Sequence, residues 1–203
     1  RRMEKPVFIH VNTVKGKGFR PAEENPGAFH SIPSSGYSKK NPDNSNHDSF
    51  SENFGRTICE FAEADDRICA VTAAMKYGTG LQYFAGSFPK RFFDVGIAEE
   101  HAVTFCAGLA KSGKIPVFAV YSSFLQRAYD EIIHDVAIDN THIVLAVDRA
   151  GFIGEDGETH QGVFDIPMLT GIPNSVIFSP SNYSEQKLCL KTAIYDCDGF
   201  AAV

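Results

Sequence analysis

The chain has 203 residues, of which 43% are hydrophobic, and a formal net charge of −6 at pH 7. This length suffices for one ordinary domain with a stable core plus an appended segment. Acidic and basic residues are interspersed, which excludes a basic face for nucleic acid and a cationic helix for a membrane surface. We therefore expect small molecules or other subunits as partners.

The cysteines and the chain ends indicate the setting of the protein. The five cysteines lie inside periodic segments and form no C-x-x-C pair, which is typical of reduced core thiols in a cytosolic protein. No apolar run approaches the roughly 20 residues of a membrane-spanning helix, and no signal peptide is recognisable. The chain begins at Arg1 and ends at Val203 in a run that resembles the start of a strand. We expect both ends to be cut from a longer chain.

The N-terminal part predicts the end of one domain followed by a linker. Residues 6–12 form a compact β-rich run, and the glycines and lysines of residues 13–18 turn the chain away from it. Residues 19–47 are rich in Pro, Gly, Ser and Asn and show no sustained periodicity. A linker of this length is uncommon unless it has a function.

From residue 48 onward, strand and helix patterns alternate. Apolar runs predict strands at residues 67–72, 91–96, 114–121, 142–147 and 175–178. Apolar residues at helical spacing predict helices at residues 48–64, 98–109, 123–140, 164–169 and 185–195, and residues 80–88 are expected to form a short helix or an irregular turn. Asp48 or Ser49 is the expected N-cap of the first of these helices. The alternation predicts an α/β fold with a doubly wound, mostly parallel sheet.

Glu99 lies where a strand passes into a helix. The short apolar run ends at Gly96, and the helical stripe begins at Ala98. Open parallel sheets have their binding crevices at such strand ends, although the helix dipole alone also favours an acid in a first turn. Glu100 and His101 add two more ionisable groups to this turn, which favours a functional site. One of the two acids must then face the crevice while the other faces solvent or a neighbour.

The loop at residues 151–162 concentrates ionisable side chains between glycines. These side chains are Glu155, Asp156, Glu158 and His160. The spacing matches neither a dinucleotide fingerprint nor an EF-hand. Three interpretations stay open: a solvated acidic loop, a site for a hard cation, or an acid–base pair in which Asp156 orients His160 beside a substrate.

Further candidates lie at the other strand ends. Tyr121 and Phe124 can line the same crevice or simply belong to the core. Arg127 and Arg149 suit a planar anion such as carboxylate or phosphate, although a lone arginine is usually part of a surface ion pair. His30, in the linker, carries no signal of its own.

Several motifs make the sequence similar to a known family. They lie at residues 15–23, 29–30, 94–105, 121–130, 134–137, 148–151 and 156–162. In this order and spacing they resemble the 1-deoxy-D-xylulose-5-phosphate synthase family of thiamine-diphosphate enzymes. The resemblance implies that residues 48–203 are a pyrimidine-binding domain. It implies that residues 1–47 are the tail of a preceding diphosphate-binding domain with its linker.

The resemblance also implies an activity. Members of this family are homodimers that use thiamine diphosphate and Mg²⁺ to condense pyruvate with D-glyceraldehyde 3-phosphate, with loss of carbon dioxide. Their metal motif, Gly-Asp-Gly followed by Asn, is absent from this sequence, so we expect no metal ligands here. We expect the isolated chain to be inactive and to bind thiamine diphosphate weakly or not at all. The implied location is the bacterial cytoplasm, with the plastid as the alternative.

The resemblance assigns roles residue by residue. The expected catalytic residues are Glu99, His160, Asp156 and His30. The expected cofactor contacts are Glu99, which meets N1′ of the aminopyrimidine, Phe124, which stacks on the ring, and Ile97. The expected substrate contacts are Tyr121, Arg127 and Arg149.

Two other functions remain open. A transketolase or the β subunit of a 2-oxo acid dehydrogenase uses the same helix-borne glutamate but lacks the loop at residues 156–162 in this form. A noncatalytic assembly or regulatory domain keeps the fold without turnover. The joint presence of Glu99, Phe124, Asp156 and His160 argues against the second alternative.

Overall fold

The computed structural model describes residues 5–27, 29–30, 49–154 and 157–203. The chain divides into two compact units, Arg1–Asn46 and His47–Val203. In the first unit, residues 15–18 form a turn in which Gly16 and Gly18 have φ of 79° and 94°, as predicted from their glycines. A short helix, α1 (Arg20–Glu24), follows in a segment for which we predicted no regular structure.

The β-rich run at residues 6–12 predicts the last strand of a preceding domain, and that role stays a prediction. These residues are extended without pairing to any residue that the structure describes, and Phe8 and Ile9 are 106% and 81% exposed. A β-rich sequence shows that a segment can pair with another strand. A strand forms only where a neighbouring strand supplies the backbone hydrogen bonds. The local sequence therefore could not decide this element.

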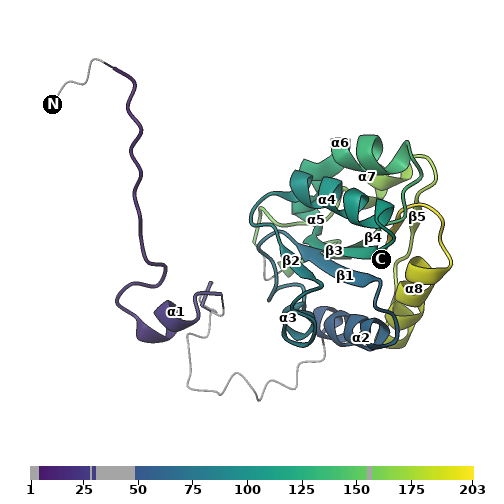
Figure 1. Ribbon diagram of the computed structural model, residues 1–203, viewed down its shortest axis with the longest axis horizontal. Helices are drawn as coiled ribbons and strands as arrows, with labels where there is room; N and C mark the ends of the chain where they lie inside the picture. The colour runs from purple at the N-terminus through teal and green to yellow at the C-terminus, as the bar shows by residue number, and fades with distance from the viewer. Residues whose placement is uncertain (1–4, 28, 31–48, 155–156) are drawn as a thin grey trace. The chain divides into compact units, whose positions relative to one another are not determined.

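The second unit is built on one six-stranded parallel sheet, with strand order β2-β1-β3-β4-β6-β5 (Figure 1). The strands are β1 (Ile68–Thr72), β2 (Phe92–Asp94), β3 (Ile115–Tyr121), β4 (Val144–Asp148), β5 (Val176–Ile177) and β6 (Ala201–Ala202). All of their pairings are parallel. The predicted α/β class and doubly wound parallel sheet are confirmed.

Helices cover both faces of this sheet (Figure 1). They are α2 (Phe50–Ala64), α3 (Gln82–Ser87), α4 (Glu99–Lys111), α5 (Ser122–Leu125), α6 (Tyr129–Glu131), α7 (Asp165–Thr170) and α8 (Tyr183–Tyr195). Along β3, Phe118 and Val120 belong to the core under α4 to α7, whereas Val117 and Ala119 belong to the core over α2, α3 and α8. Successive strand residues point to opposite faces, so one apolar strand supplies both cores.

The first long helix begins where the sequence predicts. Ser49 is the N-cap of α2, and its hydroxyl accepts a hydrogen bond from the Glu52 backbone nitrogen at 3.1 Å. The alternative cap, Asp48, lies outside the described residues. Asn182 caps α8 in the same way, with its side-chain oxygen 2.9 Å from the Glu185 nitrogen.

The predicted single helix at residues 123–140 is instead a series of short helical segments. A 3₁₀ turn (Gln126–Ala128) separates α5 from α6, and a π-helical segment (Ile132–Ala137) follows. The wide turns bond Ile138 N to Ile133 O at 3.1 Å and Thr141 N to Val136 O at 2.8 Å. Single-turn π segments of this kind are frequent at functional sites, and apolar spacing does not distinguish them from a regular helix.

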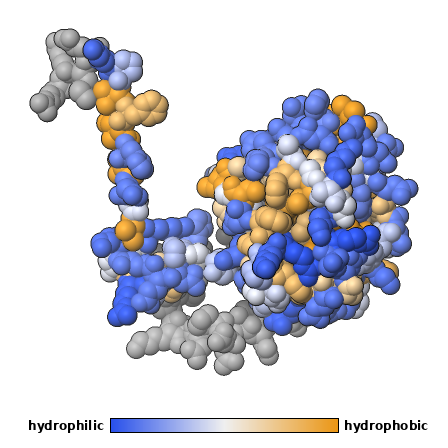
Figure 2. Space-filling view, in the orientation of Figure 1, coloured by the Kyte–Doolittle hydropathy of each residue, from blue (hydrophilic) through white to orange (hydrophobic). Residues whose placement is uncertain are grey.

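The visible face of the second unit is mostly hydrophilic (Figure 2). A smaller hydrophobic area lies toward the side that carries the α5 and β2 labels in Figure 1. Among the loops after the strands, Ile97 and Phe152 are 78% and 87% exposed. Single exposed apolar side chains are normal on a protein surface. These two lie at strand ends, where parallel sheets have their ligand-binding crevices.

Candidate active site

The segment between β2 and α4 presents one carboxylate to the interior. Asp94 accepts hydrogen bonds from the Ala74 and Gly96 nitrogens at 2.8 and 3.1 Å, and Gly96 has φ of 75°. This turn starts α4 at Glu99, which is 2% exposed, whereas Glu100 is exposed. One acid is thus buried and its neighbour is exposed, as expected, whereas the orientation of Glu99 toward a binding crevice stays a prediction.

The buried Glu99 carboxylate is paired. Arg127 Nη1 donates to Glu99 Oε2 at 3.3 Å, and the two side chains are 53% and 2% exposed. A buried charge is costly unless it is paired, so the guanidinium compensates the carboxylate from the solvent side. Of the two interpretations of Arg127, an anion ligand or a member of a surface ion pair, the structure shows an ion pair. Its partner, however, is buried.

An aromatic chain connects this ion pair to the loop at residues 151–162. The Arg127 guanidinium carbon lies 6.0 Å from the Phe124 ring centroid. Phe124 stacks near Tyr121, with centroids 5.9 Å apart and planes at 21°, and meets His160 edge-on at 5.2 Å and 86°. The Arg149 guanidinium carbon lies 4.0 Å from the Tyr121 centroid. The structure thus brings together Glu99, Arg127, Phe124, His160, Tyr121 and Arg149.

The loop that carries His160 is closed by its own backbone. Gly151 and Gly162 exchange hydrogen bonds, with N to O distances of 2.6 and 2.8 Å. The Gln161 side chain braces the loop, because it accepts from Ile153 N at 2.7 Å and donates to Ile153 O and Gly157 O at 2.9 and 2.6 Å. The Thr159 hydroxyl bonds to His160 Nδ1 at 2.6 Å. The sequence patterns identified none of these supporting contacts.

Three predicted site residues are not joined to this cluster. Asp156 lies outside the described residues, so its partnership with His160 stays a prediction. Ile97 is largely exposed just before α4. His30 belongs to the first unit, where Lys15 Nζ donates to its Nδ1 at 2.7 Å, and its catalytic role also stays a prediction.

A glycine that the sequence analysis overlooked fixes the position of Tyr121. A Cβ atom on Gly78 would lie 1.6 Å from Tyr121 Oη and 2.6 Å from its Cζ, so only glycine permits this packing. The signal that could have found it is a Gly-Thr-Gly run at residues 78–80, in a turn without any period.

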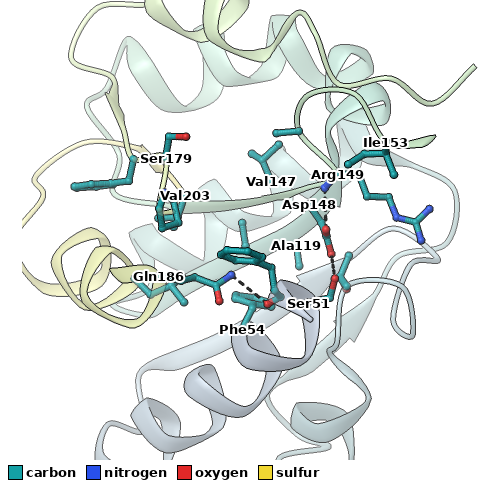
Figure 3. A pocket seen from close by; sticks show the side chains of 17 residues that line it. Ser51, Phe54, Ala119, Val147, Asp148, Arg149, Ile153, Ser179, Gln186 and Val203 are labelled. Atoms are coloured by element: carbon teal, nitrogen blue, oxygen red, sulfur yellow. Dashed lines mark hydrogen bonds between the residues drawn. The ribbon is translucent and has the colours of Figure 1, made fainter. Parts of the chain in front are cut away.

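A cavity of about 320 Å³ lies near the ends of β3 and β4, on the α2 and α8 side (Figure 3). Its walls include Phe50, Phe54, Phe178 and Leu190 as well as Ser51, Asp148, Arg149, Ser179 and Gln186. Asp148 accepts from Ser51 Oγ at 2.5 Å and from the Arg149 nitrogen at 2.8 Å. Figure 3 shows the Arg149 side chain extending away from Ser179 and Val203. Arg149 is one of the residues that line the cavity, and its guanidinium lies over the Tyr121 ring of the aromatic chain.

Comparison with known proteins identifies the domain. Residues 49–202 match the family model described as the transketolase pyrimidine-binding domain. The chain belongs to this family. The match covers the parallel sheet and every residue of the Glu99 cluster.

The pyrimidine-binding domain is similar to part of several 1-deoxy-D-xylulose-5-phosphate synthases. The chain is 53% identical over 192 residues to a 1-deoxy-D-xylulose-5-phosphate synthase of Desulforudis audaxviator, covering 95% of this chain and 30% of that protein. It is 52% identical over 194 residues to the same synthase of Clostridium acetobutylicum, covering 96% and 31%. For that of Haemophilus influenzae the identity is 49% over 204 residues, covering 100% and 32%. The chain thus spans about a third of the length of these relatives.

Solved structures share the fold of the pyrimidine-binding domain. A split-gene transketolase, described as an inactive β4 tetramer, matches with a TM-score of 0.66 and 27% identity, over 75% of this chain and 49% of that one. The transketolase of Leishmania mexicana matches with a TM-score of 0.66 and 20% identity, over 75% and 24%. The second likeness shows the fold alone.

The residues present fit the pyrimidine half of thiamine diphosphate. A buried carboxylate stands at a strand end, and the Phe124 ring is two contacts away through Arg127. The hydroxyl of Ser123 beside Phe124 is buried and has no hydrogen-bond partner among the described residues. No group of three or more His, Cys, Asp or Glu side chains in the described part of the chain could hold a metal ion.

Two general features complete the description. No helix among the described residues is long and apolar enough to cross a bilayer. All five cysteines are free, and burial raises the pKa of Cys69 to about 11. Cys69 and Cys106 are buried, and Cys59 and Cys197 are partly buried against the core, as predicted for core thiols, whereas Cys189 is partly exposed and outside the core clusters of the described residues.

Proposed function

We propose that this chain is the pyrimidine-binding part of a 1-deoxy-D-xylulose-5-phosphate synthase. The whole protein would condense pyruvate with D-glyceraldehyde 3-phosphate and release carbon dioxide. The observation that carries the proposal is the identity of about 50%, across nearly the whole chain, to relatives that all bear this name. The buried Glu99 and its aromatic neighbours support it as a site.

Thiamine diphosphate, when bound, supplies a carbon that bonds to the keto carbon of pyruvate and an electron sink for the decarboxylation. Our proposal assigns three tasks to this domain. Glu99 hydrogen-bonds the N1′ atom of the aminopyrimidine, and its burial keeps water from that bond. Phe124 stacks on the pyrimidine ring, and Ile97 covers its edge.

His160 is the proposed proton carrier beside the reacting carbon atoms. Its Nδ1 is engaged by the Thr159 hydroxyl, so we assign Nε2 to the substrate. The edge contact with Phe124 fixes the imidazole relative to the aromatic chain. Asp156 is proposed to orient His160, and His30 is proposed as a further catalytic residue.

The substrate anions are assigned to the basic and hydroxyl groups near the cavity. Arginine binds carboxylate and phosphate in a bidentate manner, and Arg149 contributes to the cavity wall as well as contacting Tyr121. Tyr121 offers its hydroxyl to the same anion. Arg127 has its guanidinium half in solvent, so it can contact a substrate while it pairs with Glu99.

The remaining proposals concern parts beyond this chain. We infer that Mg²⁺ and the diphosphate are held by groups outside it, because the Gly-Asp-Gly and Asn motif is absent from the sequence. The whole protein is proposed to be a homodimer in the bacterial cytoplasm. We propose that residues 1–47 are the end of the diphosphate-binding domain with its linker, and residues 48–203 the pyrimidine-binding domain.

The proposal is tested by assaying the whole protein for carbon dioxide and sugar phosphate formation from pyruvate and glyceraldehyde 3-phosphate. Glu99→Gln should reduce kcat by about 10² to 10⁴, the range of acid–base contributions. Glu100→Gln changes the exposed acid of the same helical turn and is the matched control. Equal activity of the two variants would contradict the role of Glu99.

The same assay separates the alternatives. A transketolase transfers a two-carbon unit between sugar phosphates without carbon dioxide, so activity with a ketose phosphate donor in place of pyruvate would favour it. A noncatalytic domain would show no turnover with either donor. His160→Gln should abolish turnover, whereas His134→Gln alters an exposed histidine, 75% accessible, and should not.

A further inference from the structure

Asp165 is a buried carboxyl group outside the contacts assigned so far. It is 8% exposed, and Ser122, which is 1% exposed, donates its hydroxyl to Asp165 Oδ1 at 2.5 Å. The other oxygen, Oδ2, is buried without a hydrogen-bond partner among the described residues. Burial raises the pKa of Asp165, and the Ser122 bond opposes that shift. A group this costly to bury calls for an explanation other than stability.

The Ser122–Asp165 bond joins two segments that each carry proposed site residues. Ser122 begins α5, between Tyr121 and Phe124. Asp165 begins α7, directly after the loop that carries His160. The bond therefore links the segment that carries Phe124 to the segment that follows His160.

Gly162 shows how closely these segments are packed. A Cβ atom at this position would lie 2.3 Å from Ser122 Oγ and 2.4 Å from the Arg149 carbonyl oxygen. The ends of β3 and β4 and the end of the loop thus meet at one point without spare room. A side chain at position 162 would force the loop away from α5.

We propose that the Ser122–Asp165 hydrogen bond is a positioning contact that holds His160 against Phe124. Neither residue touches the reacting atoms; both act through the 5.2 Å edge contact between the two rings. The proposal rests on the proposed function for its kinetic consequences, but the position of the His160 ring can be measured without turnover.

The positional test uses the whole protein with ¹³C-labelled histidine, His160 being assigned by the loss of its signal in His160→Gln. In Ser122→Ala and in Asp165→Ala, we expect the His160 ring signals to lose the ring-current shift that Phe124 causes. Asp165→Asn keeps an acceptor oxygen for Ser122 and should retain the shift. Unchanged His160 signals in Ser122→Ala would overturn the proposal even if the protein lacked synthase activity.

The kinetic test compares the kcat of Ser122→Ala with that of a control variant that loses another buried hydroxyl. Thr72→Val removes the buried bond from Thr72 Oγ1 to Ala119 O at 3.0 Å, which joins β1 to β3 and involves neither α5 nor α7. Ser122→Ala should lower kcat by at least about tenfold while the KM for pyruvate changes little, because misplacement of a reacting group affects turnover. Equal kcat in Ser122→Ala and Thr72→Val would contradict the positioning role.

A second pair of variants perturbs the same point while Ser122 and Asp165 keep their own side chains. Gly162→Ala brings a methyl group against Ser122, whereas the methyl group of Gly154→Ala, in the same loop, meets no described atom within 4 Å. We expect Gly162→Ala to lower kcat and displace the His160 signals, and Gly154→Ala to do neither. Matching behaviour of the two alanine variants would overturn the proposal, whereas an inactive wild type would contradict only the proposed function.

Discussion

Arg127 Nη1 lies 3.3 Å from Glu99 Oε2, and this bond links the most buried acid of the site to a guanidinium that is half in solvent. The pair unites a residue proposed to bind the cofactor with one proposed to contact the substrate. Any movement of Arg127 toward a substrate anion therefore changes the electrostatic surroundings of Glu99. Variants of Arg127 and Glu99 can therefore test how much this ion pair contributes to the stability of the fold.

Breaking this pair should destabilise the fold. Arg127→Met leaves the Glu99 carboxylate buried without its cation, and we expect a loss of about 1 to 3 kcal/mol, less than for a fully buried pair because the guanidinium is solvated. Combining it with Glu99→Gln should recover most of the loss in a urea-unfolding double-mutant cycle. Lys111→Met, which breaks the exposed Lys111–Asp139 bridge of 3.0 Å, is the control and should cost less than about 1 kcal/mol. Additive effects of Arg127→Met and Glu99→Gln would show that the pair does not stabilise the fold.

Gly78 should control substrate affinity through Tyr121. In Gly78→Ala the new methyl group would lie 1.6 Å from the Tyr121 hydroxyl and must displace it. This displacement should weaken the contact between the Tyr121 ring and the Arg149 guanidinium. We expect the KM for glyceraldehyde 3-phosphate to rise by about tenfold or more in the whole protein. The methyl group of Gly86→Ala, in α3, meets no atom of the described residues within 4 Å, and this variant should leave KM unchanged. A normal KM in Gly78→Ala would remove Tyr121 from the substrate contacts.

Asp165 should make the fold less stable as the pH rises. Its pKa is raised in the folded chain by burial, so folding favours its protonated form. That contribution is fully present below the ordinary carboxyl pKa and is lost as the pH rises through the raised value. Urea unfolding of wild type and Asp165→Asn, compared between about pH 3 and pH 7, should show the wild type losing stability relative to the variant. Parallel pH profiles would contradict a raised pKa.

The chain by itself should fail to bind the cofactor tightly. Its residues fit the pyrimidine, but the diphosphate and Mg²⁺ motif is absent from the sequence, so most of the binding energy is missing. Calorimetric titration of the 203-residue chain with thiamine diphosphate and Mg²⁺ should give no micromolar binding. The whole protein is the positive control. Micromolar affinity of the isolated chain would contradict the assignment of the diphosphate site to groups outside it.

The sequence by itself determined most of the local structure. The apolar runs located β1, β3 and β4 within one or two residues, and Ser49 marked the start of α2. The acid that would turn inward could be narrowed to Glu99 or Glu100 because a helix has one buried side. These features depend on residues close together in the chain, and periodicity reports the burial of such residues directly.

Only the tertiary structure decided which distant residues meet. The sequence did not predict that Arg127 pairs with Glu99, that Ser122 bonds Asp165, or that Gly78 seats Tyr121. Each of these outcomes depends on the partner that the crossovers of the sheet bring alongside, and the pattern of a single segment does not contain its partner.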